Sequence, residues 1–306
     1  MIDFNLKVFM AAAKMNSFTR AAEFLNLSQP AVTHQIKNLE NMLKTKLFMR
    51  CQNKIYLTKS GQILLKYAED INQLYQKAIR EIHEVNDKVA GDVHIGAASL
   101  LGKYLLPRII GDFKKTYPDA NISMLVGNSK EISGYLQNDV IELAIVSEPI
   151  TSFNFTAFQL YRDYLTVIIH PNHPWSKKRV ITFNDLFDED FISREVGSGT
   201  REVYLQTLEA HGNGKKLKTV MVLGNTEAVK MAVIGKMGFS IVSRLATKSE
   251  VELGLLKEIR LKSVNMSRDF FVVFKSEKNL SVPALKLKDY LKNKKKELDQ
   301  FNLNKI

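Results

Sequence analysis

The chain of 306 residues is 45% hydrophobic, so it is long enough to bury more than one core, and two or three domains are expected. Its 44 basic and 32 acidic side chains give a net charge of +12, which favours a polyanionic partner. Cys51 is the single cysteine, which excludes an intramolecular disulfide, and no signal peptide or long apolar run is evident, so we expect a cytoplasmic protein without a membrane partner. Residues 1–58 hold 8 basic and 3 acidic side chains, so part of the excess charge lies at the N-terminal end.

The first 58 residues carry the pattern of three short helices. The first ends near Asn16, Ser17 caps a second over Phe18–Asn26, and Ser28 caps a third that has Pro30 in its first turn. The third helix has one apolar face, formed by Val32, Ile36, Leu39 and Leu43. Its opposite face is polar and is formed by Thr33, His34, Lys37 and Asn38. Two helices joined by so short a turn, the second with a hydrogen-bonding face, suit insertion into the major groove of DNA.

The segment after the third helix predicts a wing. Residues 47–50 and 54–58 have the pattern of two short β segments joined by a tight connection. Arg50 and Lys54 flank that connection, so we expect both side chains to lie beside the nucleic acid backbone or in the minor groove. Residues 1–58 are therefore predicted to form a winged helix-turn-helix domain.

Residues 59–90 predict one long helix that mediates dimerisation. Apolar residues alternate at spacings of four and three, at Leu64, Ala68, Ile71, Tyr75, Ala78, Ile82, Val85 and Val89. A sustained repeat of this period favours a helix that packs along another helix. The alternative is a helix that lies on its own domain, which we consider the weaker interpretation because the stripe is narrow and long.

Gly91 begins a region in which strands and helices alternate, which is typical of α/β domains with parallel sheets. We expect one helix over residues 101–117 and two separate strands at 158–161 and 165–170, with a change to antiparallel pairing near residue 160. This pattern predicts two lobes with chain crossing between them. Lobe I would comprise 91–161 and 269–301, and lobe II would comprise 162–268.

Small polar residues recur where the predicted strands end. In a two-lobed α/β domain a ligand binds beyond the carboxyl ends of the strands, and helix N-termini that meet there suit an anion. The candidate effector-binding residues are Ser99, Leu100, Asn128, Ser129, Ser147, Glu148, Glu195, Gly197, Ser198, Gly199, Thr200, Asn225 and Thr226. For any single hydroxyl or amide, capping of its own helix is a stronger interpretation than ligand binding. For the whole set, ligand binding is the stronger interpretation, because the residues are expected to meet in one place.

Residues 17–40 closely resemble the N-terminal signature of LysR-type transcriptional regulators, and residues 47–50 and 57–61 match that family's wing and linker start. The resemblance covers essentially the whole chain. It implies a winged helix-turn-helix, a linker helix that pairs antiparallel in a dimer, and a two-lobed effector domain like that of periplasmic binding proteins. It also implies a homodimer or homotetramer, with double-stranded promoter DNA, a small effector and RNA polymerase as partners.

The resemblance also implies which residues touch DNA. Carried over by position, the predicted DNA-binding residues of the helices are Ser17, Phe18, Thr19, Ser28, Gln29, Pro30, Thr33, His34 and Lys37. The sequence departs from the family pattern at two of them, because Ser and then Arg commonly stand where Thr33 and His34 stand here. A histidine offers one donor or acceptor where an arginine grips guanine with two, so the preferred bases are expected to differ. The alternative for His34 is a solvated helix residue.

Two segments, 100–107 and 194–201, are similar to the branch of the family that controls sulfur assimilation and carbon fixation. This similarity implies a small anionic effector, either an oxidised sulfur anion or a phosphorylated metabolite. Two other classes of function remain as alternatives, a small-molecule-binding protein and an enzyme that uses the same two-lobed domain. No metalloprotease, nucleophile-elbow or phosphate-loop motif is present, so we expect neither an enzyme nor a bound cofactor or metal. Glu148 and Glu195 are the carboxylates that an enzyme could pair, although such residues are just as often ligand contacts or salt-bridge partners.

Overall fold

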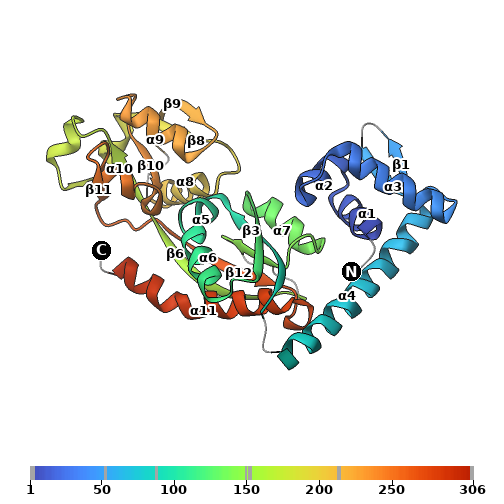
Figure 1. The fold of residues 1–306 in the computed structure, drawn as a ribbon. Helices are drawn as coiled ribbons and strands as arrows, with labels where there is room; N and C mark the ends of the chain where they lie inside the picture. Colours follow the sequence, from blue (N-terminus) through green and yellow to red (C-terminus); the bar gives the residue numbers. More distant parts are fainter. Residues whose placement is uncertain are drawn as a thin grey trace.

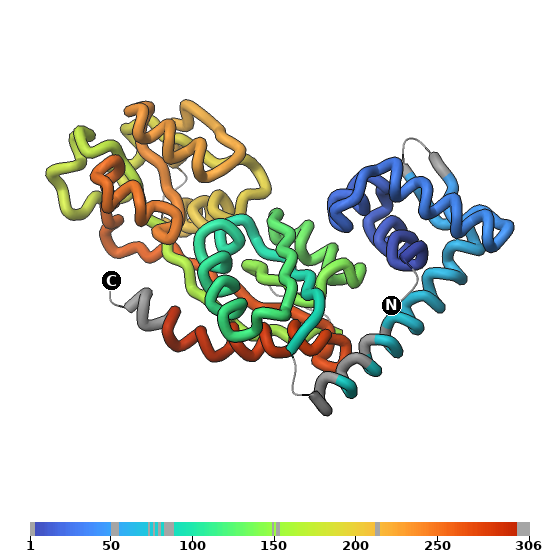
Figure 2. The backbone as a smooth tube through the Cα atoms, in the orientation of Figure 1, coloured from blue at the N-terminus to red at the C-terminus, as the bar shows by residue number. Residues whose placement is uncertain are grey.

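The computed structural model describes residues 4–51, 54–86, 89–148, 150, 154–211 and 215–303 (Figure 2). An N-terminal helical unit leads through one long helix into a larger α/β region in two parts (Figure 1). Within the described residues, no helix is both long enough and apolar enough to cross a membrane.

The helical unit consists of α1 (Phe4–Met15), α2 (Phe18–Leu25) and α3 (Gln29–Leu43). The predicted caps are confirmed. Ser17 Oγ accepts a hydrogen bond from the Arg20 amide, and Ser28 Oγ accepts one from the Ala31 amide, both at 3.3 Å. Each serine satisfies one of the N–H groups that a helix start leaves without an intrahelical partner.

The wing follows as β1 (Phe48–Cys51) and β2 (Lys54–Leu57), which pair antiparallel as predicted. The long helix α4 (Lys59–Asn86) begins directly after it. Its predicted apolar stripe does not lie on one free surface. Ala68 is fully buried and belongs to the core of the helical unit, so the first turns of α4 lie on their own domain.

The exposed apolar side chains of α4 are rotated from the predicted stripe. They are Ile63, Tyr67, Ile71, Leu74 and Ile82, each at least 51% exposed. This set shares two residues, Ile71 and Ile82, with the predicted stripe. The side chain of Val85 lies outside the described residues. The alternative interpretation, a helix that lies on its own domain, is therefore right for the start of α4. The exposed apolar face of α4 lies next to the predicted stripe on the helix surface.

Lobe I is a mixed sheet covered by helices. Its strands are β3 (Gly91–Ala98), β4 (Ala120–Gly127) and β5 (Leu143–Val146), all parallel, and β12 (Ser267–Phe274), which is antiparallel to β5. The helices are α5 (Ser99–Tyr104), α6 (Leu106–Thr116), α7 (Ser129–Gln137) and α11 (Val282–Leu303). The single helix expected over 101–117 was wrong, because the chain breaks at Leu105. Pro107 lacks an N–H and is tolerated only in the first turn of a new helix.

Lobe II is built on the far end of β6 (Thr156–Ile169), which pairs antiparallel with β10 (Ser240–Ser243) and β11 (Lys257–Leu261). The remaining strands are β7 (Val180–Ile181), β8 (Asp190–Arg194) and β9 (Lys218–Leu223), and the α-helices are α8 (Gly199–His211), α9 (Thr226–Ile234) and α10 (Lys248–Glu252). Short 3-10 turns cover Pro174–Lys177, Asn184–Phe187 and Arg244–Ala246, and a fourth, Glu277–Asn279, follows β12 in lobe I.

β6 is one continuous strand, so the two separate strands expected near residue 160 were wrong. Its first nine residues pair antiparallel with β12 in lobe I, and its last residues pair with β10 and β11 in lobe II. The expected change to antiparallel pairing near residue 160 is confirmed. β6 and β12 are therefore the crossing strands between the lobes.

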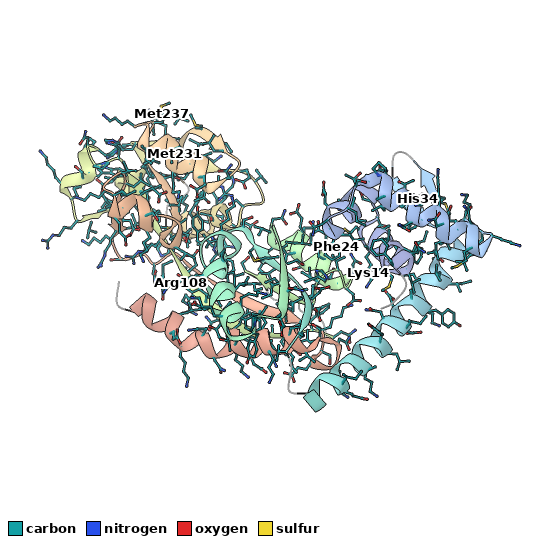
Figure 3. All side chains as sticks on the ribbon, viewed as in Figure 1. Lys14, Phe24, His34, Arg108, Met231 and Met237 are labelled. Atoms are coloured by element: carbon teal, nitrogen blue, oxygen red, sulfur yellow. The ribbon has the colours of Figure 1, made fainter. Side chains whose placement is uncertain are left out.

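The helical unit contacts lobe I (Figure 3). The ring of Phe24 lies 4.9 Å from the ring of His94, between centroids, and Lys14 Nζ donates to the carbonyl of Asp139 at 3.3 Å. Burial, together with the charge of Lys7, lowers the pKa of His94. His94 is therefore neutral at pH 7, which suits its place under an aromatic ring.

Glu40 joins α3 to the wing. Its Oε1 accepts hydrogen bonds from the amides of Leu47 at 2.9 Å and Phe48 at 3.4 Å, and its Oε2 lies 2.7 Å from Lys46 Nζ. Burial alone would raise the pKa of Glu40, but the hydrogen bonds from Lys46, Leu47 and Phe48 outweigh it and the pKa is lowered. The carboxylate is thus a buried acceptor that fixes where the wing begins.

We expect Glu40→Ala to loosen the wing, because two buried amides lose their acceptor. The loss is about 2–3 kcal/mol of local opening free energy, measured as faster amide hydrogen exchange over residues 47–57. Lys46→Ala is the control: the lysine is 74% exposed, so little protection is lost. Because the folded-state pKa of Glu40 lies below its ordinary 4.5, its contribution is complete above that pH and is lost on acidification below it. Equal exchange in wild type and Glu40→Ala would contradict this role.

Candidate DNA-binding surface and effector site

The outer face of α3 is the candidate DNA reader. Val32, Ile36 and Leu39 are buried in the helical unit, as predicted, whereas Leu43 of the same predicted face is 41% exposed. The opposite face carries the predicted residues: Ser28, Gln29, Pro30, His34 and Lys37 are exposed, and Thr33 is half-buried. Figure 3 places His34 on the side of the helical unit that is turned away from the lobes.

Side chains on this face are ordered along the helix. Gln29 Nε2 donates to Thr33 Oγ1, and Thr33 Oγ1 donates to the Gln29 carbonyl, both at 3.1 Å. Asn38 Nδ2 lies 3.3 Å from His34 Nδ1. These contacts hold short polar groups in fixed positions at the helix surface. A glutamine in such a row can bind adenine with both amide atoms.

At the start of α2, the predicted DNA-binding residues differ in how far their side chains are available. The ring of Phe18 is half-buried and packs edge-on against Phe48 of the wing, with centroids 5.3 Å apart. Ser17 is occupied as the helix cap, and Thr19 is exposed. Free N–H groups at a helix start bind phosphate well. The side chains of Arg50 and Lys54 lie outside the described residues.

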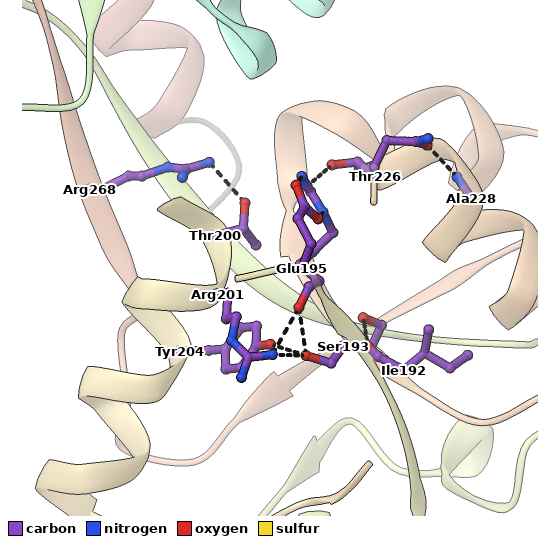
Figure 4. Close-up of polar contacts among 12 residues, drawn as sticks. Ile192, Ser193, Glu195, Thr200, Arg201, Tyr204, Thr226, Ala228 and Arg268 are labelled. Atoms are coloured by element: carbon purple, nitrogen blue, oxygen red, sulfur yellow. Dashed lines mark hydrogen bonds and ion pairs between the residues drawn. The ribbon is translucent and has the colours of Figure 1, made fainter. Parts of the chain in front are cut away.

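The candidate effector site lies where α8 begins, at the junction of the lobes. Gly197 has φ +85°, a left-handed conformation that glycine adopts without strain, and α8 starts at Gly199. Ser198 and Thr200 are buried. Thr200 Oγ1 accepts a hydrogen bond from Arg268 Nη2 at 3.2 Å (Figure 4). Arg268 stands on the crossing strand β12, so this contact ties α8 to both lobes.

Lobe I contributes a pair of hydroxyls. Ser129 Oγ and Ser147 Oγ lie 3.0 Å apart, and the Ser147 amide donates to Ser129 Oγ at 3.3 Å. A Cβ placed on Gly199 would lie 2.9 Å from Arg268 Nη1 and 3.9 Å from Ser147 Oγ. The structure therefore brings these predicted residues of the two lobes around one point, beside Arg268.

A second cluster is formed around Arg194. Its Nε and Nη2 bind the two carboxylate oxygens of Glu195 at 2.6 and 2.7 Å, and its Nη1 donates to Thr226 Oγ1 at 2.6 Å. The hydrogen bonds from Arg194 lower the pKa of Glu195. Glu195 is thus an ionised, paired carboxylate rather than a proton donor. Glu148 is exposed, so the two glutamates do not form a buried acid–base pair.

The remaining predicted residues have local roles in the fold. Asn128 caps α7 in a capping box with Glu131, and Asn225 caps α9 by accepting from the Ala228 amide at 2.8 Å. Ser99 Oγ donates to the Gly127 carbonyl at 3.0 Å. Leu100 is half-buried and packs against the core of lobe I. These contacts match the helix-capping alternative for the two asparagines.

The prediction from sequence missed Arg268, its partner Asp163, and a bridge between the lobes at Tyr104. The Tyr104 hydroxyl donates to Glu227 at the start of α9. Beside it, the buried amine of Lys230 lies 3.0 Å from Glu227 and 2.6 Å from Glu250. Burial, and then the hydrogen bond to Glu227, raise the pKa of Tyr104, so the hydroxyl stays a donor.

Arg201 also belongs to the junction. Its Nη1 donates to Ser193 Oγ at 2.9 Å and to the Arg194 carbonyl at 3.0 Å, and Ser193 Oγ lies 2.7 Å from the Tyr204 hydroxyl (Figure 4). These bonds hold the end of β8 against α8. The start of α8 is therefore held by the end of β8 as well as by Arg268.

A hollow lies on lobe I, away from the junction. Its lining residues are Gln137, Asn154, Phe155, Lys275, Ser276 and Asn279. None of the predicted effector residues lines it. Within the part of the chain that the structure describes, no group of three or more His, Cys, Asp and Glu side chains is placed to hold a metal.

Comparison with known protein families assigns the chain to one of them. Residues 5–62 match the bacterial regulatory helix-turn-helix of the LysR family, and residues 86–296 match the LysR substrate binding domain. The chain is a LysR-type transcriptional regulator. Members of the family bind DNA and small effectors and form oligomers. The prediction of a winged helix-turn-helix joined to a two-lobed α/β effector domain is confirmed.

Several relatives point to one branch of the LysR family. A probable RuBisCO transcriptional regulator of Phaeodactylum tricornutum is 31% identical over 298 residues, which cover 96% of this chain and 97% of the relative. The transcriptional activator CmpR of Synechocystis is 31% identical over 285 residues and 93% of each chain. These relatives are transcriptional regulators, and the predicted likeness to the carbon-fixation branch is confirmed.

Solved structures agree with the fold. The regulatory domain of Synechocystis CcmR, in complex with 2-phosphoglycolate, superposes with a TM-score of 0.62 at 31% identity and covers 68% of this chain and 99% of its own. Full-length CbnR complexed with its target DNA has a TM-score of 0.56 at 17% identity, covers 96% of this chain and 100% of its own, and shows the shared fold.

Proposed function

We propose that this LysR regulator reads promoter DNA with the outer face of α3 and responds to a small phosphorylated anion bound at the lobe junction. The observation that carries the DNA assignment is the ordered polar row on α3, in which Gln29 is held over Thr33 beside His34 and Lys37. Gln29 and Thr33 would contact base edges, and Lys37 would bind phosphate. Ser17 and Ser28 cap the two helices, and Pro30 lies in the first turn of α3.

The ligand proposal rests on chemistry at the junction. Hydroxyls of Ser129, Ser147 and Thr200 meet the start of α8, whose N–H groups and dipole favour an anion. CcmR, whose regulatory domain is 31% identical, binds 2-phosphoglycolate, a molecule with a phosphate at one end and a carboxylate at the other. We extend this ligand class to the present chain. An oxidised sulfur anion is the second candidate, because it fits the same donors.

The protein is proposed to act in the cytoplasm as a regulator without catalytic activity, with RNA polymerase as a further partner. The relatives, all transcriptional regulators by name, support the proposal of a regulator without catalytic activity. The exposed apolar face of α4 is proposed to pair with α4 of a second copy. Such a face is large for a solvated helix, and antiparallel pairing would cover it.

Pairing through α4 predicts that Leu74→Glu, at a position 70% exposed, separates the subunits, because a carboxylate would have to be buried in an apolar interface. Sedimentation equilibrium would show monomers where the wild type is dimeric or tetrameric. Leu253→Glu is the matched control, since this leucine is 73% exposed on lobe II, and it should leave the assembly unchanged. An unchanged assembly for Leu74→Glu would place the interface elsewhere.

Two α3 variants separate base reading from phosphate binding. Gln29→Ala should remove about 1–3 kcal/mol of discrimination between a selected operator and random DNA. Lys37→Ala should weaken binding to both DNAs similarly and reduce the slope of log K against log salt by about 1. Binding titrations at several salt concentrations measure both effects. A Gln29→Ala protein that loses the same affinity for operator and for random DNA would show that Gln29 reads no base.

The effector proposal is tested on the full-length protein bound to its selected operator. We expect 2-phosphoglycolate to bind with measurable heat and to change the pattern of DNA protection, because a ligand at the junction favours one arrangement of the lobes. Sulfate, sulfite and O-acetylserine are tested in the same way as alternative candidate effectors. Absence of heat and of any change in protection with all four compounds would refute the proposed ligand class.

A further inference from the structure

The crossing strands carry two neighbouring ion pairs, in which the acidic and the basic residue exchange strands. In the β6–β12 ladder Asp163 stands opposite Arg268, and Arg162 stands opposite Asp269. Because successive side chains on a strand point to opposite faces, one pair faces solvent and the other faces the interior. Arg162 is 50% exposed, whereas Arg268 is 12% and Asp163 1% exposed. The two pairs are chemically alike and differ in burial.

Burial of the inner pair calls for a reason other than strand pairing. Removing two charges from water offsets most of their attraction, so a buried pair is a poor source of stability. Burial raises the pKa of Asp163, and Arg268 and the Ser243 hydroxyl act against that rise. The outer pair, Arg162 with Asp269, already aligns the same strands without this desolvation. The inner pair therefore places a guanidinium, at a cost in desolvation, where it reaches the start of α8 from the crossing strands.

Arg268 is fixed on three sides. Its Nε donates to Asp163 Oδ2 at 3.1 Å, and its Nη2 donates to Thr200 Oγ1 at 3.2 Å. Its guanidinium carbon, Cζ, lies 5.0 Å from the centroid of the Phe270 ring. Among the described residues Nη1 has no hydrogen-bond partner. That nitrogen lies beside Gly199, because a Cβ added there would lie 2.9 Å from it and 3.9 Å from Ser147 Oγ.

We propose that Arg268 binds the acidic group of the effector through Nη1, with the Ser147 hydroxyl as a second donor from lobe I. The inference deepens the proposed function and rests on it, since it names the residue that recognises the charge of the ligand. A fixed guanidinium suits phosphate or carboxylate because its N–H groups match the oxygens of those anions. Glycine at position 199 leaves the approach to Nη1 free of a side chain.

The binding test compares four full-length proteins with 2-phosphoglycolate as the probe: wild type, Arg268→Gln, the double variant Asp163→Asn/Arg268→Gln, and Arg162→Gln. The double variant removes the charge without leaving a buried carboxylate unpaired, so it guards against loss of folding. Arg162→Gln is the matched control, one position along the same strand pair. We expect Arg268→Gln and the double variant to bind about 10- to 100-fold more weakly by calorimetry, and Arg162→Gln to bind like wild type.

The outcomes separate the two proposals. Wild-type binding that persists unchanged in the double variant overturns the role of Arg268 and leaves the ligand class intact. No binding to wild type overturns the ligand class, and the role of Arg268 with it. Equal weakening in Arg162→Gln and Arg268→Gln also overturns the inference, because it would reflect damage to the strand pair rather than loss of a ligand contact.

A measurement on the wild type alone needs no altered protein to fold. With 15N-labelled arginine, the side-chain resonances of Arg268 and Arg162 can be followed while 2-phosphoglycolate is added. We expect the Arg268 resonances to shift in proportion to binding and those of Arg162 to stay in place. Saturation of binding with no shift at Arg268 contradicts the proposal.

Discussion

The antiparallel ladder between β6 and β12 joins two sheets that would otherwise be separate. Strand β5 of lobe I pairs with β12, and strands β10 and β11 of lobe II pair with β6. Each lobe is thus anchored on a different strand of one ladder, and relative movement of the lobes must twist or bend it. The register shifts between Phe270 and Phe271, and a bulge of this kind increases local twist. A group fixed on the ladder at this point is coupled to both lobes.

The parts of the molecule that sequence predicted well are those set by neighbours along the chain. Ser17 and Ser28 cap helices because their hydroxyls reach amides three residues ahead, and the buried face of α3 follows from a period of 3.6 residues. A wing of two short strands needs only a tight connection. These local rules, together with a specific motif, were sufficient for the DNA-binding unit and for the α/β character of the rest.

The parts that sequence did not predict depend on contacts between distant segments. The free face of α4 is decided by which of its turns lie on α1, and Ala68 looks the same in the sequence whether it faces α1 or a second copy. Asp163 and Arg268 lie 105 positions apart, and no spacing rule gives the register of β6 on β12. Arg268 could have been found only from that register, whereas the hydroxyls around it were found because they follow strands.

The two anion-binding surfaces proposed for this chain differ in physical origin. The DNA-binding unit gains affinity from excess positive charge on its surface, which salt screens within about 8–10 Å. At the lobe junction the charges are largely balanced, because Glu195 is paired with Arg194 and Asp163 with Arg268. What remains there are Nη1 of Arg268 and the N–H and O–H groups around it, held in fixed directions. Recognition at the junction, as proposed, depends on one fixed guanidinium and on oriented donors rather than on a broad excess of charge, so we expect ionic strength to change DNA binding more than effector binding.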